Sequence, residues 1–484
     1  MSTGKYKPQF PRVAQLKTAE QFRNHLEAQA IKLDFDEELI AGEASPFARG
    51  HQLRSGNRIG NSFCILPMEG WDGTAEGKPS DLTKRRWENF AISGAKLLWG
   101  CEAVAVRHEG RANPNQLLMN ESNLSDFEGL YQLVDKAHND RFGNTGDLLT
   151  GLQLTHSGRF SKPNSKTQME PKILYRHPVL DKKFGIPKDY PIMTDGDLNE
   201  LVDDYIRAAV LSQKAGFRFV DIKHCHGYLG HELLSAYDRE GIYGQSLENR
   251  SRFLREIVAG IRSEAAGLEI GVRMSIFDWM PFQKGLEEIG IPAVEGMYKY
   301  AFGADQTGLT TDLTEPFGFL EELKKLDIEL LCTTAGSPYY NPHIQRPAIF
   351  PPSDGYMPPE DPLAGVARQI EATAEVKKAF PNFYVVGSAY SYLQEWLPNV
   401  AHEVLRTGKA DSIGLGRMVL SYPDLPADLL AGDSMKRGKI CRTFSDCTTA
   451  PRNGMISGCF PLDPFYKKME EFGRLKELKA EAGQ

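Results

Sequence analysis

The chain lacks a long hydrophobic run, an excess of basic residues and an N-terminal apolar core. No stretch of eighteen or more consecutive apolar residues occurs, so the sequence predicts no membrane-spanning helix and no membrane partner. The formal net charge of -7 argues against a nucleic-acid partner, because nucleic acids bind basic surfaces. Residues 1–17 carry basic side chains without an apolar segment behind them, which is not typical of a secretory signal.

Cysteine is also scarce. The seven cysteines are odd in number and scattered, so they do not form the dense framework of a disulfide-stabilised secreted protein. A reducing, cytoplasmic location is the simplest interpretation. With 41% hydrophobic residues the 484-residue chain can bury a large core, and although this length could hold two or three average domains, barrel enzymes often run this long as one unit.

Short apolar runs alternate with longer helical patterns from residue 62 onward. Eight such runs occur, at residues 62–66, 96–99, 148–154, 217–222, 268–274, 328–333, 383–386 and 411–415. The helical patterns between them include residues 82–95, 195–215, 247–263, 365–379 and 392–407. This alternation indicates parallel strands joined by right-handed crossovers, and eight units predict an α/β fold, a (β/α)8 TIM barrel.

Three regions are predicted along the chain. Residues 1–55 form an N-terminal extension with one amphipathic helix at 19–31, residues 56–440 form the barrel, and residues 441–484 form a tail. The charged helix predicted at 465–482 favours a surface or subunit contact, which leaves a homo-oligomer open. Long loops at 277–316 and 337–362 follow the fifth and sixth strands, where barrel enzymes place their active sites, so they are expected to shape the pocket.

The segment after the fourth strand concentrates ionisable groups. Lys223, His224, His226 and Tyr228 follow the apolar run within six residues, and such groups are costly to bury unless they pair or act. One alternative is a structural ion pair between Asp221 and Lys223, which share one side of the strand. Another is metal binding by the two histidines, although no third ligand lies nearby in sequence.

This segment, together with residues 243–253, resembles the signature of the old yellow enzyme family of NADH:flavin oxidoreductases. The family's barrel relatives include 2,4-dienoyl-CoA reductases and trimethylamine dehydrogenase. Further collinear matches occur at the ends of six other strands, at residues 57–68, 102–111, 153–159, 272–275, 386–387 and 416–417. The match spans about residues 56–425. It implies an FMN-dependent enzyme that takes electrons from NAD(P)H and acts on a small molecule.

The resemblance also assigns cofactor-binding roles. Arg273 would stand against flavin N1 and O2, where a fixed cation stabilises the reduced ring. Gln153 would meet N3–H and O2, because an amide offers both donor and acceptor. Backbone groups near Pro67, Met68 and Ala103 would reach O4 and N5. The phosphate would lie at the last two strands, against these residues: Gly387, Ser388, Gly416 and Arg417. For the glycines alone, tight turns are the competing interpretation.

By the same resemblance, three residues would act on the substrate. Lys223 and His226 occupy the positions of the donor pair that holds the carbonyl oxygen of an activated alkene, and Tyr228 occupies the position of the tyrosine that protonates the α-carbon. The implied reaction is reduction of that C=C bond. The alternative is a flavin-dependent dehydrogenase that oxidises an amine or alcohol-type substrate. A third possibility from another class is a non-catalytic flavin-binding scaffold.

Two of these positions depart from the family pattern. Lys223 replaces the usual histidine, and Glu69 stands where relatives carry threonine or cysteine beside the flavin. An ammonium favours a more anionic partner than an imidazole does. We therefore form the hypothesis that Glu69 and Lys223 are a coupled pair that selects the substrate.

The tail carries an incomplete cysteine motif. Larger relatives bind an iron–sulfur cluster on four cysteines after the barrel, whereas this chain has Cys441, Cys447 and Cys459, with Phe444 near the remaining position. No metal and no iron–sulfur cluster are therefore expected. No nucleotide-binding domain follows, so the reductant is expected to be free NAD(P)H or a separate electron-transfer protein.

Overall fold

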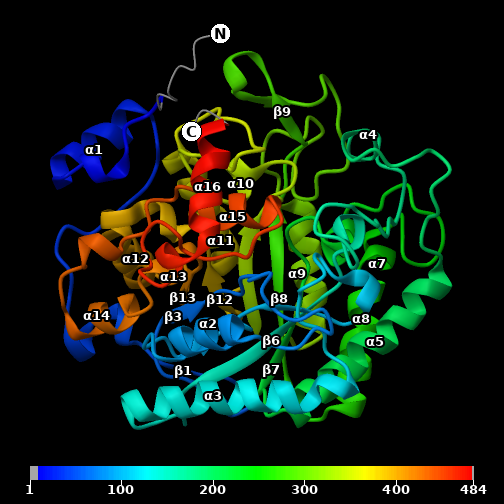
Figure 1. Ribbon diagram of the computed structural model, residues 1–484, viewed down its shortest axis with the longest axis horizontal. Coiled ribbons are helices and arrows are strands. Elements are labelled where there is room, and N and C mark those ends of the chain that lie inside the picture. Colours follow the sequence, from blue (N-terminus) through cyan, green and yellow to red (C-terminus); the bar gives the residue numbers. More distant parts are fainter. Residues whose placement is uncertain (1–8, 482–484) are drawn as a thin grey trace.

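The computed structural model describes residues 9–481, and its centre is a closed barrel of eight parallel strands (Figure 1). All eight predicted strands are confirmed, in chain order as β3 (Phe63–Ile65), β4 (Leu97–Leu98), β6 (Leu149–Thr155), β7 (Phe219–Ile222), β8 (Glu269–Phe277), β11 (Leu330–Ala335), β12 (Tyr384–Gly387) and β13 (Ser412–Leu415). The barrel closes because β3 pairs with both β4 and β13, in parallel register. A short strand, β5 (Ala103–Ala105), continues the second strand along β6.

The barrel interior is filled by side chains. A buried cluster of inward-pointing residues occupies it, made up of Leu53, Ile59, Cys64, Leu66, Leu97, Trp99, Leu149, Phe219, Leu330, Cys332, Tyr384 and Val386. The rings of Trp99 and Phe219 meet edge to face at 5.4 Å. Large apolar and β-branched side chains are typical of a barrel interior, because each strand is buried both against the interior and against the outer helices.

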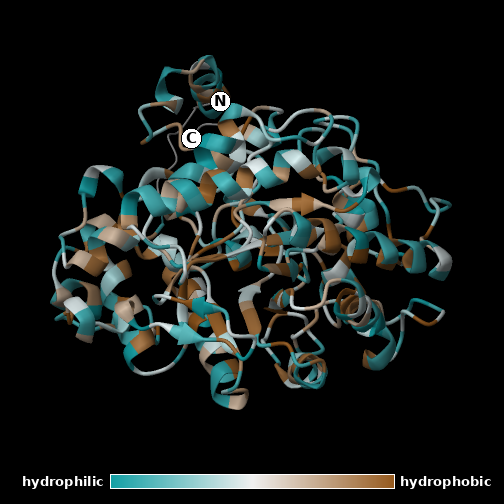
Figure 2. Ribbon diagram, turned by 90° about the horizontal axis from the view of Figure 1, so that it is seen from below, coloured by the Kyte–Doolittle hydropathy of each residue, from teal (hydrophilic) through white to brown (hydrophobic). Residues whose placement is uncertain are grey.

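Helices form the outer layer. They follow the strands in order as α2 (Asp81–Ala91), α3 (Leu124–Phe142), α5 (Asp195–Lys214), α8 (Arg252–Glu264), α9 (Thr314–Lys325), α11 (Pro362–Ala379), α12 (Leu397–Arg406) and α13 (Arg417–Ser421). Figure 2 shows the apolar residues gathered on the strands and on the helix faces turned toward them. The helix predicted over 247–263 is divided at Ser251 into α7 (Leu247–Arg250) and α8, and the one predicted over 392–407 begins as a 3-10 segment (Tyr390–Trp396).

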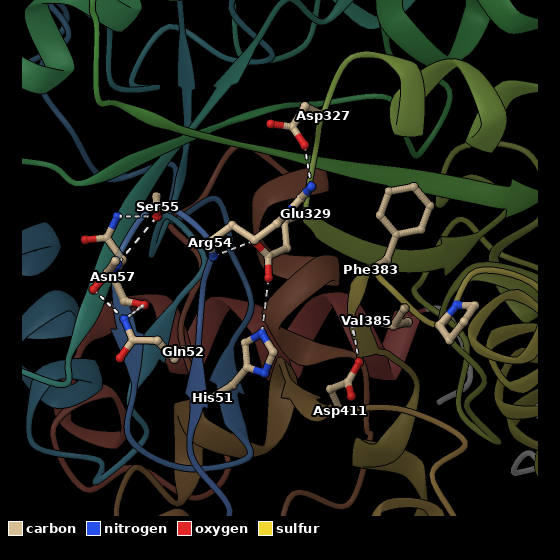
Figure 3. Close-up of polar contacts among 12 residues, drawn as sticks. His51, Gln52, Arg54, Ser55, Asn57, Asp327, Glu329, Phe383, Val385 and Asp411 are labelled. Carbon is tan, nitrogen blue, oxygen red and sulfur yellow. Dashed lines mark hydrogen bonds and ion pairs between the residues drawn. The ribbon is translucent and has the colours of Figure 1, made fainter.

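The N-terminal extension runs along the outside of the barrel, where Phe22 stacks on Trp396 at 4.6 Å, and then reaches its base (Figure 1). Its helix α1 (Ala19–Ala28) ends three residues earlier than predicted. A hairpin of β1 (His51–Gln52) and β2 (Arg58–Ile59) covers the end where the barrel strands begin (Figure 3).

Loops and the tail cover the opposite end. The loop after β8 carries a hairpin of β9 (Phe282–Lys284) and β10 (Gly290–Pro292), the loop after β11 carries α10 (Pro342–Gln345), and the loop after β6 carries α4 (Leu180–Lys183). The chain then runs through α14 (Leu425–Ala431), α15 (Asp446–Arg452) and α16 (Glu470–Glu481). The tail is joined to the barrel where the Ser457 amide donates to the Gly70 carbonyl at 2.8 Å. Across residues 9–481, no helix is both long and apolar enough to cross a membrane.

Candidate active site

A cavity opens at the C-terminal end of the barrel strands, and most of the predicted residues meet there. Its walls include these sequence-predicted residues: Pro67, Met68, Glu69, Ala103, Gln153, Lys223, His226, Tyr228, Arg273, Ser388, Gly416 and Arg417. Gly387 is the exception. It lies within β12, where a Cβ atom would come within 2.7 Å of the Tyr390 hydroxyl, so close packing explains this glycine and it does not line the wall.

Asp221 organises the floor of the cavity. Its carboxylate accepts from the Gln153 side-chain amide at 2.5 Å and from the Arg273 backbone N–H at 2.6 Å. Burial raises the pKa of Asp221 to about 6. The alternative of an ion pair between Asp221 and Lys223 is therefore wrong, because Asp221 instead fixes the two residues assigned to the flavin ring.

Arg273 and Gln153 keep groups free for a ligand. The Nε atom of Arg273 is buried without a hydrogen-bond partner in the described chain. Gln153 uses its side-chain nitrogen to bond Asp221, so its side-chain oxygen could accept a hydrogen bond from a ligand. A buried donor without a partner is costly, which favours a ligand that supplies the acceptor. A flavin ring fits this donor and acceptor set.

Glu69 is the centre of the substrate-side cluster. Its carboxylate accepts from the Tyr228 hydroxyl at 3.0 Å and from the Trp71 indole N–H at 3.3 Å, and the Lys223 ammonium lies 3.5 Å away. Lys223 Nζ also lies 3.7 Å from the centroid of the Tyr228 ring. The Tyr228 hydroxyl is 2.9 Å from that of Tyr339. The contact within the hypothesised Glu69–Lys223 pair is present, and its role in selection stays a prediction.

Tyr228 is buried and His226 is half-buried, and the surroundings of both side chains favour the uncharged form. Burial and the Glu69 carboxylate raise the pKa of Tyr228 well above its usual value, so the phenol keeps its proton. Burial, together with the charges of Arg273 and Lys223, lowers the pKa of His226 well below its usual value. His226 Nε2 lies 3.3 Å from the Thr334 hydroxyl, and the backbone of His226 adopts a positive φ of 66°.

His224 points away from this cavity. Its Nδ1 lies 3.0 Å from the Ile222 carbonyl, and its ring packs against Phe319 of α9 at 5.9 Å. Among residues 9–481, no group of histidines, cysteines and carboxylates is arranged to hold a metal ion. His224 and His226 therefore contact different parts of the chain and do not converge on one point.

Two guanidinium groups meet beyond the ends of β12 and β13. Arg417 Nη1 and Arg346 Nη2 are buried with no hydrogen-bond partner within the described residues. Burial and the charges of Arg417 and Arg452 lower the pKa of Arg346 to about 10. The position of a Cβ atom on Gly416 meets nothing closer than 3.9 Å, so the backbone there is open to a ligand. A phosphate group fits two uncompensated cations beside an open glycine.

A buried ionic network supports the loop that carries Glu69. Arg86 binds both Asp72 and Glu102, and the Gly70 amide donates to Glu102 at 3.0 Å. Burial raises the pKa of Glu102 to about 7. In the same loop Trp71 adopts a positive φ of 56°, a strained conformation for a large side chain.

The tail contributes to the cavity, which the sequence did not predict. Its wall includes Cys447, Thr448, Pro451, Arg452 and Ser457. The three tail cysteines are free thiols that line a second, smaller cavity beside Arg417, with Phe444 also on its wall. Burial raises the pKa of Cys441 and Cys459. The loops supply further unpredicted wall residues: Trp71, Thr334, Tyr339, Gln345, Arg346 and Ser391.

Comparison with known proteins agrees with this geometry. Residues 60–306 match the model of the NADH:flavin oxidoreductase / NADH oxidase family. The chain belongs to this family. It is accordingly an FMN-dependent, NAD(P)H-linked oxidoreductase of the old yellow enzyme type, and the residues above fit the group that the family binds.

Individual relatives share between 17% and 27% of their aligned residues with this chain. A curated NADPH dehydrogenase from Geobacillus sp. (strain WCH70) is 27% identical over 376 residues, which cover 77% of this chain and 90% of that protein. Two solved structures share the fold. Morphinone reductase is 17% identical with a TM-score of 0.56, covering 83% of this chain and 95% of that one. A 2-naphthoyl-CoA reductase complex is 18% identical with a TM-score of 0.64, covering 88% of this chain and 58% of that longer one.

Proposed function

We propose that this oxidoreductase reduces an activated C=C bond, one conjugated to a carbonyl or carboxylate group. The observation that carries the proposal is the meeting of the Tyr228 hydroxyl and the Lys223 ammonium at one carboxylate, that of Glu69. The chemistry that FMN supplies when bound is the transfer of hydride from NAD(P)H to the substrate. The protein residues must then hold the substrate oxygen and deliver a proton.

Lys223 and His226 suit the first task. Negative charge grows on the carbonyl oxygen when the β-carbon receives hydride, so donors fixed near that oxygen stabilise the transition state. Lys223 provides an ammonium, and neutral His226 provides one ring N–H. Both side chains line the same cavity as Arg273 and Gln153.

Tyr228 suits the second task. Its raised pKa keeps the phenol protonated, and the proton can pass to the α-carbon. The phenolate that remains lies beside the Lys223 ammonium, which stabilises it. The Tyr339 hydroxyl at 2.9 Å offers a path for the returning proton.

The same cluster argues against one form of the alternative, in which an amine or alcohol-type substrate is oxidised: the form in which the substrate is a cationic amine. A cation is attracted to the face of a tyrosine ring, and in this cavity Lys223 already occupies the face of Tyr228. An ammonium substrate at that place would meet a like charge. A carbonyl-bearing substrate can instead accept a hydrogen bond from the ammonium.

Anaerobic mixing of the purified holoenzyme tests the proposal. NAD(P)H should bleach the flavin absorbance, and an activated alkene such as cyclohex-2-enone should restore it. Bleaching by an amine alone would support the oxidative alternative. A flavin that responds to neither reagent would indicate a non-catalytic flavoprotein.

A further inference from the structure

Three cationic side chains lie on the wall of the cavity or close behind its wall residues. Arg452 of α15 lines the cavity itself. Lys162, in the loop after β6, lies with Nζ 5.5 Å from the ring centroid of Trp71, another wall residue. Lys183 of α4 donates to the Phe282 carbonyl at 3.4 Å. Three separate parts of the chain therefore bring positive charge to one rim.

Aromatic contacts join these cations to the cavity wall. The Phe184 ring, next to Lys183, lies 5.4 Å from Phe160, which stacks on the wall residue Tyr339 at 4.1 Å. Arg452 donates to the carbonyl of Pro338, the residue before Tyr339, at 2.5 Å. The rim is thus built on the same residues that face the substrate-side cluster.

The rim has more positive than negative charge. Within residues 9–481 neither Lys162 nor Lys183 forms an ion pair, and Arg452 pairs with Asp354, whose side chain is 61% exposed. Desolvation, followed by the charge of Arg452, lowers the pKa of Lys162 and brings that of Lys183 to about 8. Such a surplus is unexpected in a chain with a formal net charge of -7. A cluster in which cations outnumber their counter-ions favours an anionic ligand.

We propose that Lys162, Lys183 and Arg452 bind the phosphate monoester of a nucleotide ribose beside this cavity. The three cations outnumber the single carboxylate of Asp354, and the positive charge that remains is similar in size to the negative charge of a phosphate monoester, about -1.5 to -2 at neutral pH. Trp71 and Tyr339 are half-buried and line the cavity, so aromatic surface of the kind on which nucleotide bases stack lies close to these cations. This inference rests on the proposed function, because that function brings a nucleotide to the flavin.

Two molecules carry this chemistry. One is NADPH, with a phosphate on the 2′ position of the adenosine ribose. The other is a coenzyme A thioester substrate, with a phosphate on the 3′ position. The same three cations would recognise either group, so the experiment must distinguish the two sources.

The test uses the holoenzyme and the variants Lys162→Gln and Lys183→Gln, with Lys182→Gln as the matched control. Lys182 is the neighbour of Lys183 and is exposed as Lys183 is, but it lacks the contact of Lys183 with the Phe282 carbonyl. Calorimetric titrations with 2′,5′-ADP and with 3′,5′-ADP measure binding directly. Values of KM for NADPH and NADH are then compared across the variants.

For the NADPH source, each site variant should weaken 2′,5′-ADP binding and raise KM for NADPH about tenfold, with KM for NADH unchanged. For the thioester source, the loss should appear with 3′,5′-ADP instead. In both cases Lys182→Gln should match the wild type. Failure of the wild type to bind either nucleotide, or equal binding by all variants, would overturn the proposal.

The experiment distinguishes failure of the rim site from failure of the proposed catalytic function. If neither NADH nor NADPH bleaches the wild-type flavin, the catalytic proposal fails while the titrations still report on the rim. If NADH bleaches the flavin but the site variants behave as wild type, only the rim site is wrong.

Discussion

The two ends of the barrel use charged residues in opposite ways. At the base, Glu329 accepts from the Arg54 backbone at 2.9 Å and side chain at 3.2 Å, and lies 3.3 Å from His51 (Figure 3). At the mouth, Arg346 and Arg417 each bury a guanidinium nitrogen with no partner in the described chain. Glu329 at the base is thus bonded within the protein, whereas Arg346 and Arg417 at the mouth each keep one guanidinium nitrogen for which a ligand could supply the acceptor.

This difference separates stability from function. In TIM barrels the strand beginnings stabilise the fold and the strand ends carry the chemistry. Polar groups that are paired within the protein contribute to folding, and unpaired buried groups oppose it until a ligand binds. Variants at the base should therefore change stability and leave cofactor binding alone, and variants at the mouth should do the reverse.

The largest effect is expected for Tyr228→Phe at the mouth. Loss of the proton donor should lower kcat for alkene reduction by about 10²- to 10⁴-fold. Bleaching of the flavin by NAD(P)H should continue at the wild-type rate, because that step needs no proton from Tyr228. Stopped-flow absorbance resolves the two half-reactions. An unchanged rate of alkene reduction would assign the proton to another group.

Arg417→Gln should weaken FMN binding next most strongly. Removal of one charge-assisted contact to the phosphate is expected to raise the Kd for FMN about 10- to 100-fold. The apoprotein should unfold at the same temperature or higher, since an unpaired buried charge is removed. Flavin fluorescence titration and thermal unfolding measure both. A destabilised apoprotein with normal FMN affinity would contradict the comparison.

Glu329→Gln tests the base. The substitution keeps the shape of the side chain and removes the charge that Arg54 contacts, which should lower the free energy of unfolding by about 1–3 kcal/mol. FMN affinity and turnover of the folded enzyme should not change. Denaturant unfolding of the variant beside the wild type gives the stability difference. Loss of FMN binding without loss of stability would reverse the assignment of the two ends.

The sequence predicted the strands and the wall residues at strand ends for the same physical reason. Each barrel strand is a short apolar run buried on both faces, and residues such as Gln153 and Arg273 lie on those runs. The residues it missed come from irregular segments. Trp71, Arg346 and Arg452 have no periodic pattern around them, and contacts such as Ser457 with Gly70 join parts far apart in the chain. The sequence left a pair between Asp221 and Lys223 open as an alternative, because strand periodicity gives the side of the strand on which a residue lies and not the group that it contacts.

The smallest effect is expected for Lys223→His. Because histidine restores the family pattern but loses the permanent charge, the kcat/KM ratio for carboxylate-bearing over neutral alkenes should fall about tenfold. The flavin reduction potential should shift as well, since Glu69 loses its cationic partner. Glu69→Gln provides the reciprocal variant. Unchanged substrate preference and potential in Lys223→His would disprove the coupled pair.

Extraction of the cofactor from purified protein tests the central claim most directly. If the unpartnered groups at the mouth bind a flavin phosphate and ring, the protein should be yellow and should release FMN, identified by chromatography, in a one-to-one ratio to the chain. Colourless protein that fails to take up added FMN would contradict the assignment of the cavity.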